Sequence, residues 1–355
     1  MKIFVAGQAP EQGNIIGLRR HTLAKSDHKE AMRRTAIAWV GAVLWSVGSI
    51  TLAQESAPDE EGATQADSFR PMVVYLVKPS QTDPSIQRFD ENHYVVFDPA
   101  TSACAGCKAC AGCNAHGNLV VFMPGTNGKP SNAARLLRVV ASQGYRVLGL
   151  EYDDEPAVVQ VCPRDPSPRC SGEFRRERIF GNAESPFVHN SPAESIVNRL
   201  IKLLEYLDRQ HPQEQWGSYL HDGTPDWSRI VVSGLSQGAG MAAYIAKRES
   251  VARVVLFSSP WDYFGSAQTL APWLYDASAT PPQRWFAEYH KHENTATLIA
   301  RAYRVLKIPS ENILIFDLPI PPGMRRGHSD NPFHGSTIRV PDYEPQWRVL
   351  FGRSP

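Results

Sequence analysis

The feature that most constrains the fold is the pentapeptide GLSQG at 234–238, which follows an apolar run and precedes a run of small residues. The β-branched stretch before it predicts a strand, and the alanine-rich stretch after it predicts a helix. A very tight turn must join the two, and Gly234 and Gly238 avoid the clashes that side chains would cause there. Such a turn lifts the Ser236 hydroxyl out of the sheet at a helix N-terminus, where a developing anion is stabilised. The alternative is a glycine-rich turn without chemistry.

The remainder of the chain alternates short apolar runs with helical patterns. Almost wholly apolar strands that are separated by helices indicate a mostly parallel sheet with helices on both faces. We therefore predict an α/β fold. The predicted strands lie at 72–77, 93–97, 119–123, 145–150, 229–233, 253–258, 285–289 and 312–317, and the predicted helices at 132–143, 191–211, 238–248, 295–306 and from 345 onward.

One helix start carries a capping signature. Ser191 is placed to be the N-cap, Pro192 the first helical residue, and Glu194 the partner in a capping box. Apolar residues recur at helical spacing from Ile196 to Leu207, which indicates one buried stripe. This helix is therefore predicted to begin at Ser191.

With strand, glycine-flanked serine and helix in this order, the chain resembles the α/β-hydrolase superfamily. It looks most like exported bacterial serine hydrolases that carry a G-x-S-x-G nucleophile elbow. The resemblance covers about residues 70–353 in element order, and GLSQG is its specific part. It implies an eight-stranded, mostly parallel sheet, a Ser–acid–His triad in that chain order with Ser236 as nucleophile, and no cofactor.

The resemblance also points to the other two members of the triad. Glu293 lies where the acid usually falls, and Asp262, after the preceding strand, is the alternative. Either carboxylate can orient an imidazole from its loop. The base is expected after the last strand, in a segment that holds His328 and His334. We predict the triad Ser236, Glu293 and His328, with Asp262 as the alternative acid and His334 as the alternative base.

The oxyanion-binding loop is expected directly after the strand at 119–123. That strand runs into PGTNG at 124–128, which resembles the glycine-rich loop that brings backbone N–H groups to the substrate oxygen. The expected donors are the backbone N–H of Gln237 and that of Thr126 or Asn127. An ordinary glycine turn is the alternative.

The most hydrophobic segment, at 35–53, lies near the N-terminus and not at it. Basic residues precede it and small residues end it at Ala53, the layout of a secretory signal peptide that is cleaved after that residue. A membrane anchor is the competing interpretation, because 19 residues are just enough to span a bilayer. We favour the signal peptide, with Met32 as the true start and 1–31 as a start-site extension. Residues 54–69 are acidic and poor in apolar residues, which predicts a flexible leader before the domain at 70–355.

The six cysteines form two groups. Cys104, Cys107, Cys110 and Cys113 have a spacing that would suggest zinc or iron–sulfur in a cytosolic protein. Export changes this expectation, because disulfides persist outside the cytoplasm. We predict no metal and two local disulfides there, in a pairing that the sequence leaves open, and a third disulfide between Cys162 and Cys170.

The charge of the chain and its aromatic residues restrict which binding partners and substrates are expected. Without residues 1–53 the chain has 30 basic and 33 acidic residues, so electrostatic binding of nucleic acid is excluded. The segment 261–286 is crowded with Trp, Phe and Tyr, and it predicts either a cap-like insertion over the site or core packing.

The predicted protein is a periplasmic or secreted esterase that acts on small-molecule or polymeric esters, with no membrane anchor after cleavage and an oligomeric state that the sequence leaves open. The alternatives are a non-catalytic ligand-binding module on the same fold and a metal-binding surface protein built around 104–113.

Overall fold

The computed structural model describes residues 71–102, 117–181, 185–324 and 330–352. All of them belong to one compact unit, residues 65–355. The predicted signal peptide, the leader at 54–69, the cysteines at 104–113 and His328 lie outside the described residues.

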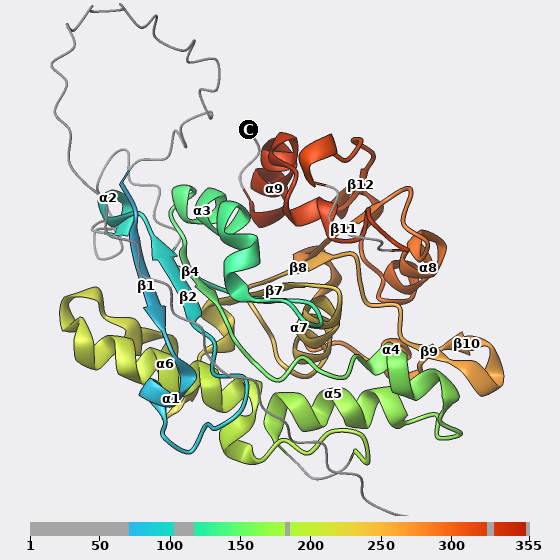
Figure 1. Cartoon of the computed structure of the whole chain (residues 1–355), viewed down its shortest axis with the longest axis horizontal. Helices are drawn as coiled ribbons and strands as arrows, with labels where there is room; N and C mark the ends of the chain where they lie inside the picture. Colours follow the sequence, from blue (N-terminus) through green and yellow to red (C-terminus); the bar gives the residue numbers. More distant parts are fainter. Residues whose placement is uncertain (1–70, 103–116, 182–184, 325–329, 353–355) are drawn as a thin grey trace, which may run out of the picture. The chain divides into compact units, whose positions relative to one another are not determined.

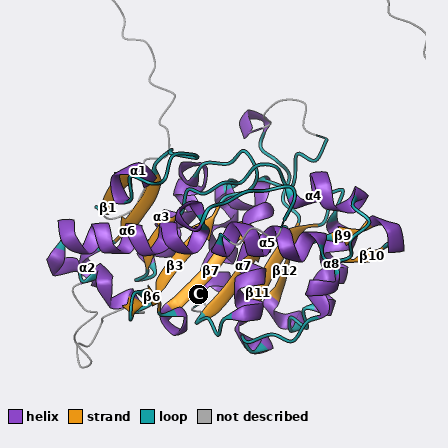
Figure 2. Cartoon of the chain, turned by 90° about the horizontal axis from the view of Figure 1, so that it is seen from below, coloured by secondary structure: helices purple, strands orange, loops and turns teal. Residues whose placement is uncertain are grey.

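An eight-stranded sheet forms the centre of this unit, with the strand order β1-β2-β4-β3-β7-β8-β11-β12. β1 is antiparallel to β2 and β2 to β4, and each later pair of neighbours is parallel. Figure 2 shows strands of this sheet, in orange, among the helices. Each of the eight predicted strands is confirmed within two residues at either end. The strands are β1 (Val73–Val77), β2 (His93–Phe97), β3 (Leu119–Met123), β4 (Arg146–Gly149), β7 (Ile230–Leu235), β8 (Arg253–Phe257), β11 (Trp285–His290) and β12 (Ile313–Phe316).

Helices cover both faces of the sheet, as the sequence predicts. Side chains of β3 alternate between the two cores: Val121 packs with α5, α6, α7 and α8, whereas Phe122 packs with α3 and α9. Figure 1 shows α3 and α9 on one side of the strands and α5 and α6 on the other. The longer helices are α3 (Ala134–Ser142), α5 (Cys170–Phe180), α6 (Ile196–Gln210), α7 (Gln237–Arg248), α8 (Ala296–Val305) and α9 (Glu344–Phe351). The short elements are α1 (Pro79–Thr82), α2 (Pro99–Ser102), α4 (Val158–Val161), and the hairpins β5 (Leu220–His221) with β6 (Thr224–Pro225) and β9 (Tyr263–Phe264) with β10 (Thr269–Leu270).

The start of α6 differs from the prediction. Its N-cap is Ser195, whose Oγ accepts a hydrogen bond from the backbone N–H of Asn198 at 3.1 Å. The predicted N-cap, Ser191, precedes a separate turn of 3₁₀ helix. The capping box does not form because the carboxylate of Glu194 binds the guanidinium of the buried Arg199 instead.

Helix α5 was not predicted, because its buried face is charged. Arg175, Glu177 and Arg178 are each about 1% exposed, so no apolar stripe marks this helix in the sequence. The predicted disulfide between Cys162 and Cys170 is confirmed, with an S–S distance of 1.98 Å, and it joins the end of α4 to the start of α5.

The aromatic segment 261–286 divides between core and surface. Trp273 and Trp285 are at most 5% exposed and belong to the main core, whereas Tyr275 is 56% exposed. Core packing therefore accounts for these two tryptophans. No helix among the described residues is both long and apolar enough to span a bilayer.

Candidate active site

Ser236 occupies a strained turn between β7 and α7. Its φ and ψ are 54° and −118°, and positive φ is costly for a residue with a side chain. Backbone hydrogen bonds hold the turn: the Ser236 N–H donates to Phe257 O at 2.9 Å, and the Gly240 N–H donates to Ser236 O at 3.0 Å. The serine therefore sits at the carboxyl end of a central strand, at the first turn of a helix.

The two glycines of the pentapeptide are required by close backbone contacts. A Cβ on Gly238 would lie 2.0 Å from the carbonyl oxygen of Met123, at the end of β3. A Cβ on Gly234 would lie 2.5 Å from the carbonyl carbon of Gly238. Both distances are far inside van der Waals contact, so only glycine fits at either position.

The loop after β3 lies against Ser236. A Cβ on Gly125 would lie 3.1 Å from the Cβ of Ser236. The Gly128 N–H donates to Gly125 O at 2.8 Å, and Asn127 has a φ of 57°, so residues 125–128 form a tight turn. The turn therefore packs closely against the serine.

Asp154 fixes the far side of this turn. Its carboxylate accepts the Gly128 N–H at 3.1 Å and also a backbone hydrogen bond from Asn127. Burial raises the pKa of Asp154 to about 6, although these hydrogen bonds oppose the shift. Since the backbone of Asn127 is engaged with Asp154, the geometry favours Thr126 over Asn127 as an oxyanion donor.

Gln237 is the first residue of α7, where helix N–H groups have no partner within the helix. Its side chain contacts the start of α4 and the residues just before it: Oε1 accepts the Val158 N–H at 3.3 Å, and Nε2 donates to Pro156 O at 3.3 Å. The side chain thus ties this segment to the elbow.

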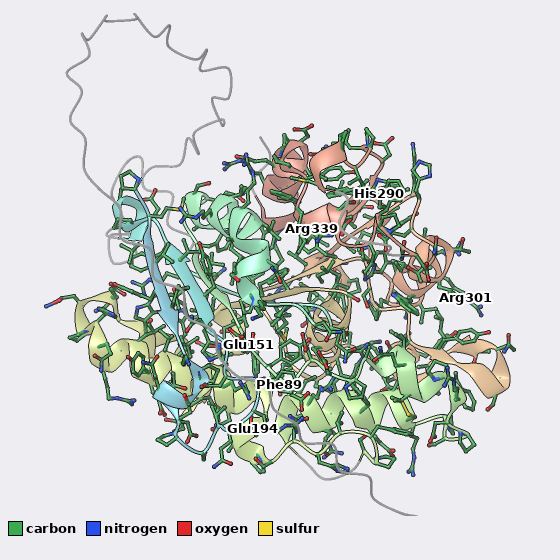
Figure 3. The ribbon with its side chains drawn as sticks, in the orientation of Figure 1. Phe89, Glu151, Glu194, His290, Arg301 and Arg339 are labelled. Carbon is green, nitrogen blue, oxygen red and sulfur yellow. A yellow bond between two sulfur atoms is a disulfide. The ribbon has the colours of Figure 1, made fainter. Side chains whose placement is uncertain are left out.

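A carboxylate and an imidazole meet at the ends of β11 and β12. The Oε2 atom of Glu293 lies 2.7 Å from Nδ1 of His334, and Glu293 is 5% exposed. The other carboxylate oxygen, Oε1, accepts the Ser258 Oγ–H at 2.6 Å and the backbone N–H of His290 at 2.8 Å. Figure 3 shows His290 in the region of β11 and β12. Three donors therefore hold the carboxylate in one orientation.

Asp262, the alternative acid, has other partners. Its two oxygens accept hydrogen bonds from Nε and Nη2 of Arg175 at 2.7 and 2.5 Å, and Oδ2 also accepts the Trp273 indole N–H at 2.8 Å. All described contacts of this carboxylate are thus with an arginine and a tryptophan, and Glu293 is the candidate that meets a histidine.

Two residues near the site, Arg175 and Glu288, could not be assigned to it from any sequence pattern. Arg175 donates from Nη1 to Gln237 O at 3.3 Å, and its guanidinium lies 2.2 Å from where a Cβ on Gly240 would be. Glu288 on β11 is fully buried, and burial followed by the charge of Glu293 raises its pKa well above the usual range. In the sequence around α7, only Gly240 indicates that another side chain, that of Arg175, packs closely on this helix.

Two cavities lie near the elbow. A cavity of about 20 Å³ is lined by Ser236 and Gln237 together with Trp261 and neighbouring residues. A cavity of about 300 Å³ is lined by the loop after β3, by Leu235 and by Gly335. Ser236 therefore lines the smaller cavity, and its neighbour Leu235 lines the larger one.

The topology of the sheet and the elbow at Ser236 define an α/β-hydrolase fold. No protein-family model matches the chain, and no curated protein matches it. Among solved structures it is similar to a hormone-sensitive lipase from a metagenome library, with a TM-score of 0.40 at 13% identity over 79% of this chain and 84% of that one. It is also similar to a ferulic acid esterase, with a TM-score of 0.41 at 12% identity over 80% of this chain and 100% of that one. A third is the fluorophosphonate-binding serine hydrolase F of Staphylococcus aureus, with a TM-score of 0.40 at 10% identity over 80% and 99%.

Proposed function

We propose that the chain is an exported serine hydrolase that cleaves carboxylic esters through an acyl-enzyme. The observation that carries the proposal is the 2.7 Å contact between Glu293 and His334, because it places a buried acid on an imidazole after the last strand. Together with Ser236 in the elbow, this contact supplies a nucleophile, an acid and a base in the chain order Ser236, Glu293, His334. His334, the alternative base, is the histidine that the proposal adopts.

The proposed reaction follows from the two nitrogen atoms of His334. When Nδ1–H donates to Glu293, Nε2 has a free lone pair and acts as the base. Ser236 Oγ attacks the ester carbonyl carbon as its proton passes to Nε2, and the same proton then goes to the departing alcohol oxygen. A water molecule attacks the acyl-enzyme in the second half, with His334 again taking and returning the proton. The products are an alcohol and a carboxylic acid.

The negative oxygen of each tetrahedral intermediate needs hydrogen-bond donors. The backbone N–H groups of Gln237 and Thr126 are the proposed pair, since one begins a helix and the other lies in the turn against Ser236. One such donor accounts for about 10²–10³ in turnover. Glu293 stabilises the imidazolium that forms at the same time.

The export part of the proposal rests on the sequence at 32–53 and on the disulfide. Disulfides persist in oxidising compartments, and the Cys162–Cys170 bond agrees with a periplasmic or secreted location. Analysis of culture fractions and N-terminal sequencing tests this part, and a mature N-terminus at Gln54 is expected.

Ester hydrolysis by the purified protein tests the catalytic part. We expect turnover of 4-nitrophenyl acetate that falls at least about 10⁴-fold in Ser236→Ala, with the same melting temperature in both proteins. Equal turnover by both proteins contradicts the proposal. A well-folded parent without turnover on any ester favours the ligand-binding module.

A further inference from the structure

The smaller of the two cavities limits what can be attached to the reacting carbonyl. Its volume is about 20 Å³, close to the space that holds one water molecule. A methyl group is of similar size, and a longer alkyl chain is not. The lining side chains include Ser236, Gln237, Val158, Val159 and Trp261.

The walls of this cavity are fixed by contacts that resist expansion. The Val158 N–H is bound to Gln237 Oε1 at 3.3 Å, and the disulfide Cys162–Cys170 follows directly after α4. Arg175 and Asp262 also line the cavity, and they form an ion pair in which both side chains are 1% exposed. Interiors packed in this way admit extra methylene groups only at the expense of strain.

The larger cavity borders the loop after β3 and the residue that follows the proposed base. Its volume is about 300 Å³, at the lower end of sites that hold small molecules. Gly335, the residue after His334, contributes to its lining, as do Gly125 and Leu235 next to the serine. Phe122, Ala133 and Ile338 give it apolar walls.

The reaction assigns one substrate group to each cavity. The departing alcohol oxygen must receive its proton from His334, so the alcohol lies on the side of that histidine and the larger cavity. The acyl substituent points the other way, past Gln237, into the smaller cavity. We infer that the substrates are esters of very short acids, acetate above all, with small-molecule alcohols. The inference rests on the proposed function.

A series of 4-nitrophenyl esters tests the acyl part. We expect kcat/KM to fall at least about tenfold from acetate to butyrate, and further to octanoate, because each added methylene overfills the cavity. A kcat/KM that rises with chain length and still depends on Ser236 overturns the inference and leaves the proposed function standing. Absence of Ser236-dependent turnover on every ester overturns the proposed function itself.

Two variants widen the small cavity at partly exposed wall residues, Trp261→Ala and Val159→Ala. Each is expected to raise the butyrate-to-acetate ratio of kcat/KM at least about fivefold, and the second serves if the first does not fold. Ile338→Ala, which widens the larger cavity, is the matched control and is expected to leave this ratio unchanged. A ratio that moves only in Ile338→Ala overturns the orientation.

Acetate esters of different alcohols test the leaving-group part. Replacing 4-nitrophenyl acetate by the bulkier 4-methylumbelliferyl acetate is expected to change kcat/KM by less than about threefold. A tenfold loss with this larger alcohol contradicts the assignment of the alcohol to the larger cavity.

Discussion

The Nδ1 atom of His334 lies 2.7 Å from the Oε2 atom of Glu293, although 41 residues separate them in the chain. The parallel pairing of β11 with β12 brings the loops after the two strands to one edge of the sheet. Since β7 ends at the same edge, the topology gathers Ser236, Glu293 and His334 on three loops of one rigid sheet.

The roles of the two candidate acids are separable by mutation. Glu293→Gln is expected to lower kcat about 10²–10⁴-fold at nearly unchanged stability, because the amide cannot stabilise an imidazolium. Asp262→Asn leaves Arg175 buried without its counter-charge, so we expect a loss of about 3–5 kcal/mol in stability and less than tenfold in turnover by the folded protein. Kinetics and urea unfolding of both variants check this. A larger kcat loss in Asp262→Asn contradicts the assignment.

The two histidines make a second matched pair. His334→Ala is expected to lose at least about 10³-fold in kcat, because it removes the base that contacts Glu293. His328→Ala is expected to keep kcat within about fivefold. The comparison uses one ester at saturating concentration. If the His328 variant is inactive and the His334 variant is active, His328 is the base, as the sequence predicts.

The glycine contacts at the elbow predict a stability difference. Gly238→Ala places a Cβ 2.0 Å from Met123 O, so we expect it to lose at least about 3 kcal/mol or to fail to fold. Gly172→Ala in α5 is the control, since its Cβ meets nothing closer than Trp273 Cβ at 3.5 Å and alanine favours a helix. Urea unfolding of both variants is the measurement. Equal stability would contradict the tight packing at the elbow.

Glu151, on the loop after β4, predicts a pH dependence of stability (Figure 3). Burial, and then the charge of Asp154, raise its pKa from 4.5 to about 8. The folded protein then holds a proton that the unfolded chain releases, so this residue lowers stability as pH rises from 4.5 to about 8.

The variant Glu151→Gln removes that pH dependence. We expect it to be more stable than the parent at pH 8.5, by on the order of 2 kcal/mol, and equal to it near pH 4. Unfolding at the two pH values measures this, with the exposed Glu311→Gln as control. A variant that is less stable than the parent at pH 8.5 would show that the charged form of Glu151 is stabilising.

The sheet was predictable from the sequence because its strands are short apolar runs that almost no polar residue interrupts. The elbow was predictable because backbone crowding at Gly234 and Gly238 admits glycine alone. Helix α5 was not, since its buried Arg175 and Arg178 pair with aspartates that lie far away in the chain.

The predicted start of α6 was wrong for a related reason. Ser191 and Glu194 have the spacing of a capping box, but Glu194 pairs with Arg199, and Ser195 caps the helix. His328 and His334 are both next to a glycine in one segment, and no sequence pattern reveals the contact between His334 and Glu293. Long-range pairing of charged groups is the information that local sequence patterns do not carry.

The most direct test of the central claim is the intact mass of the protein after exposure to a fluorophosphonate, beside Ser236→Ala treated in the same way. An activated serine attacks phosphorus and displaces fluoride, which leaves a stable covalent adduct. We predict one adduct on the parent and none on the variant. A well-folded parent without adduct, or an adduct that persists on Ser236→Ala, would contradict the assignment of Ser236 as nucleophile.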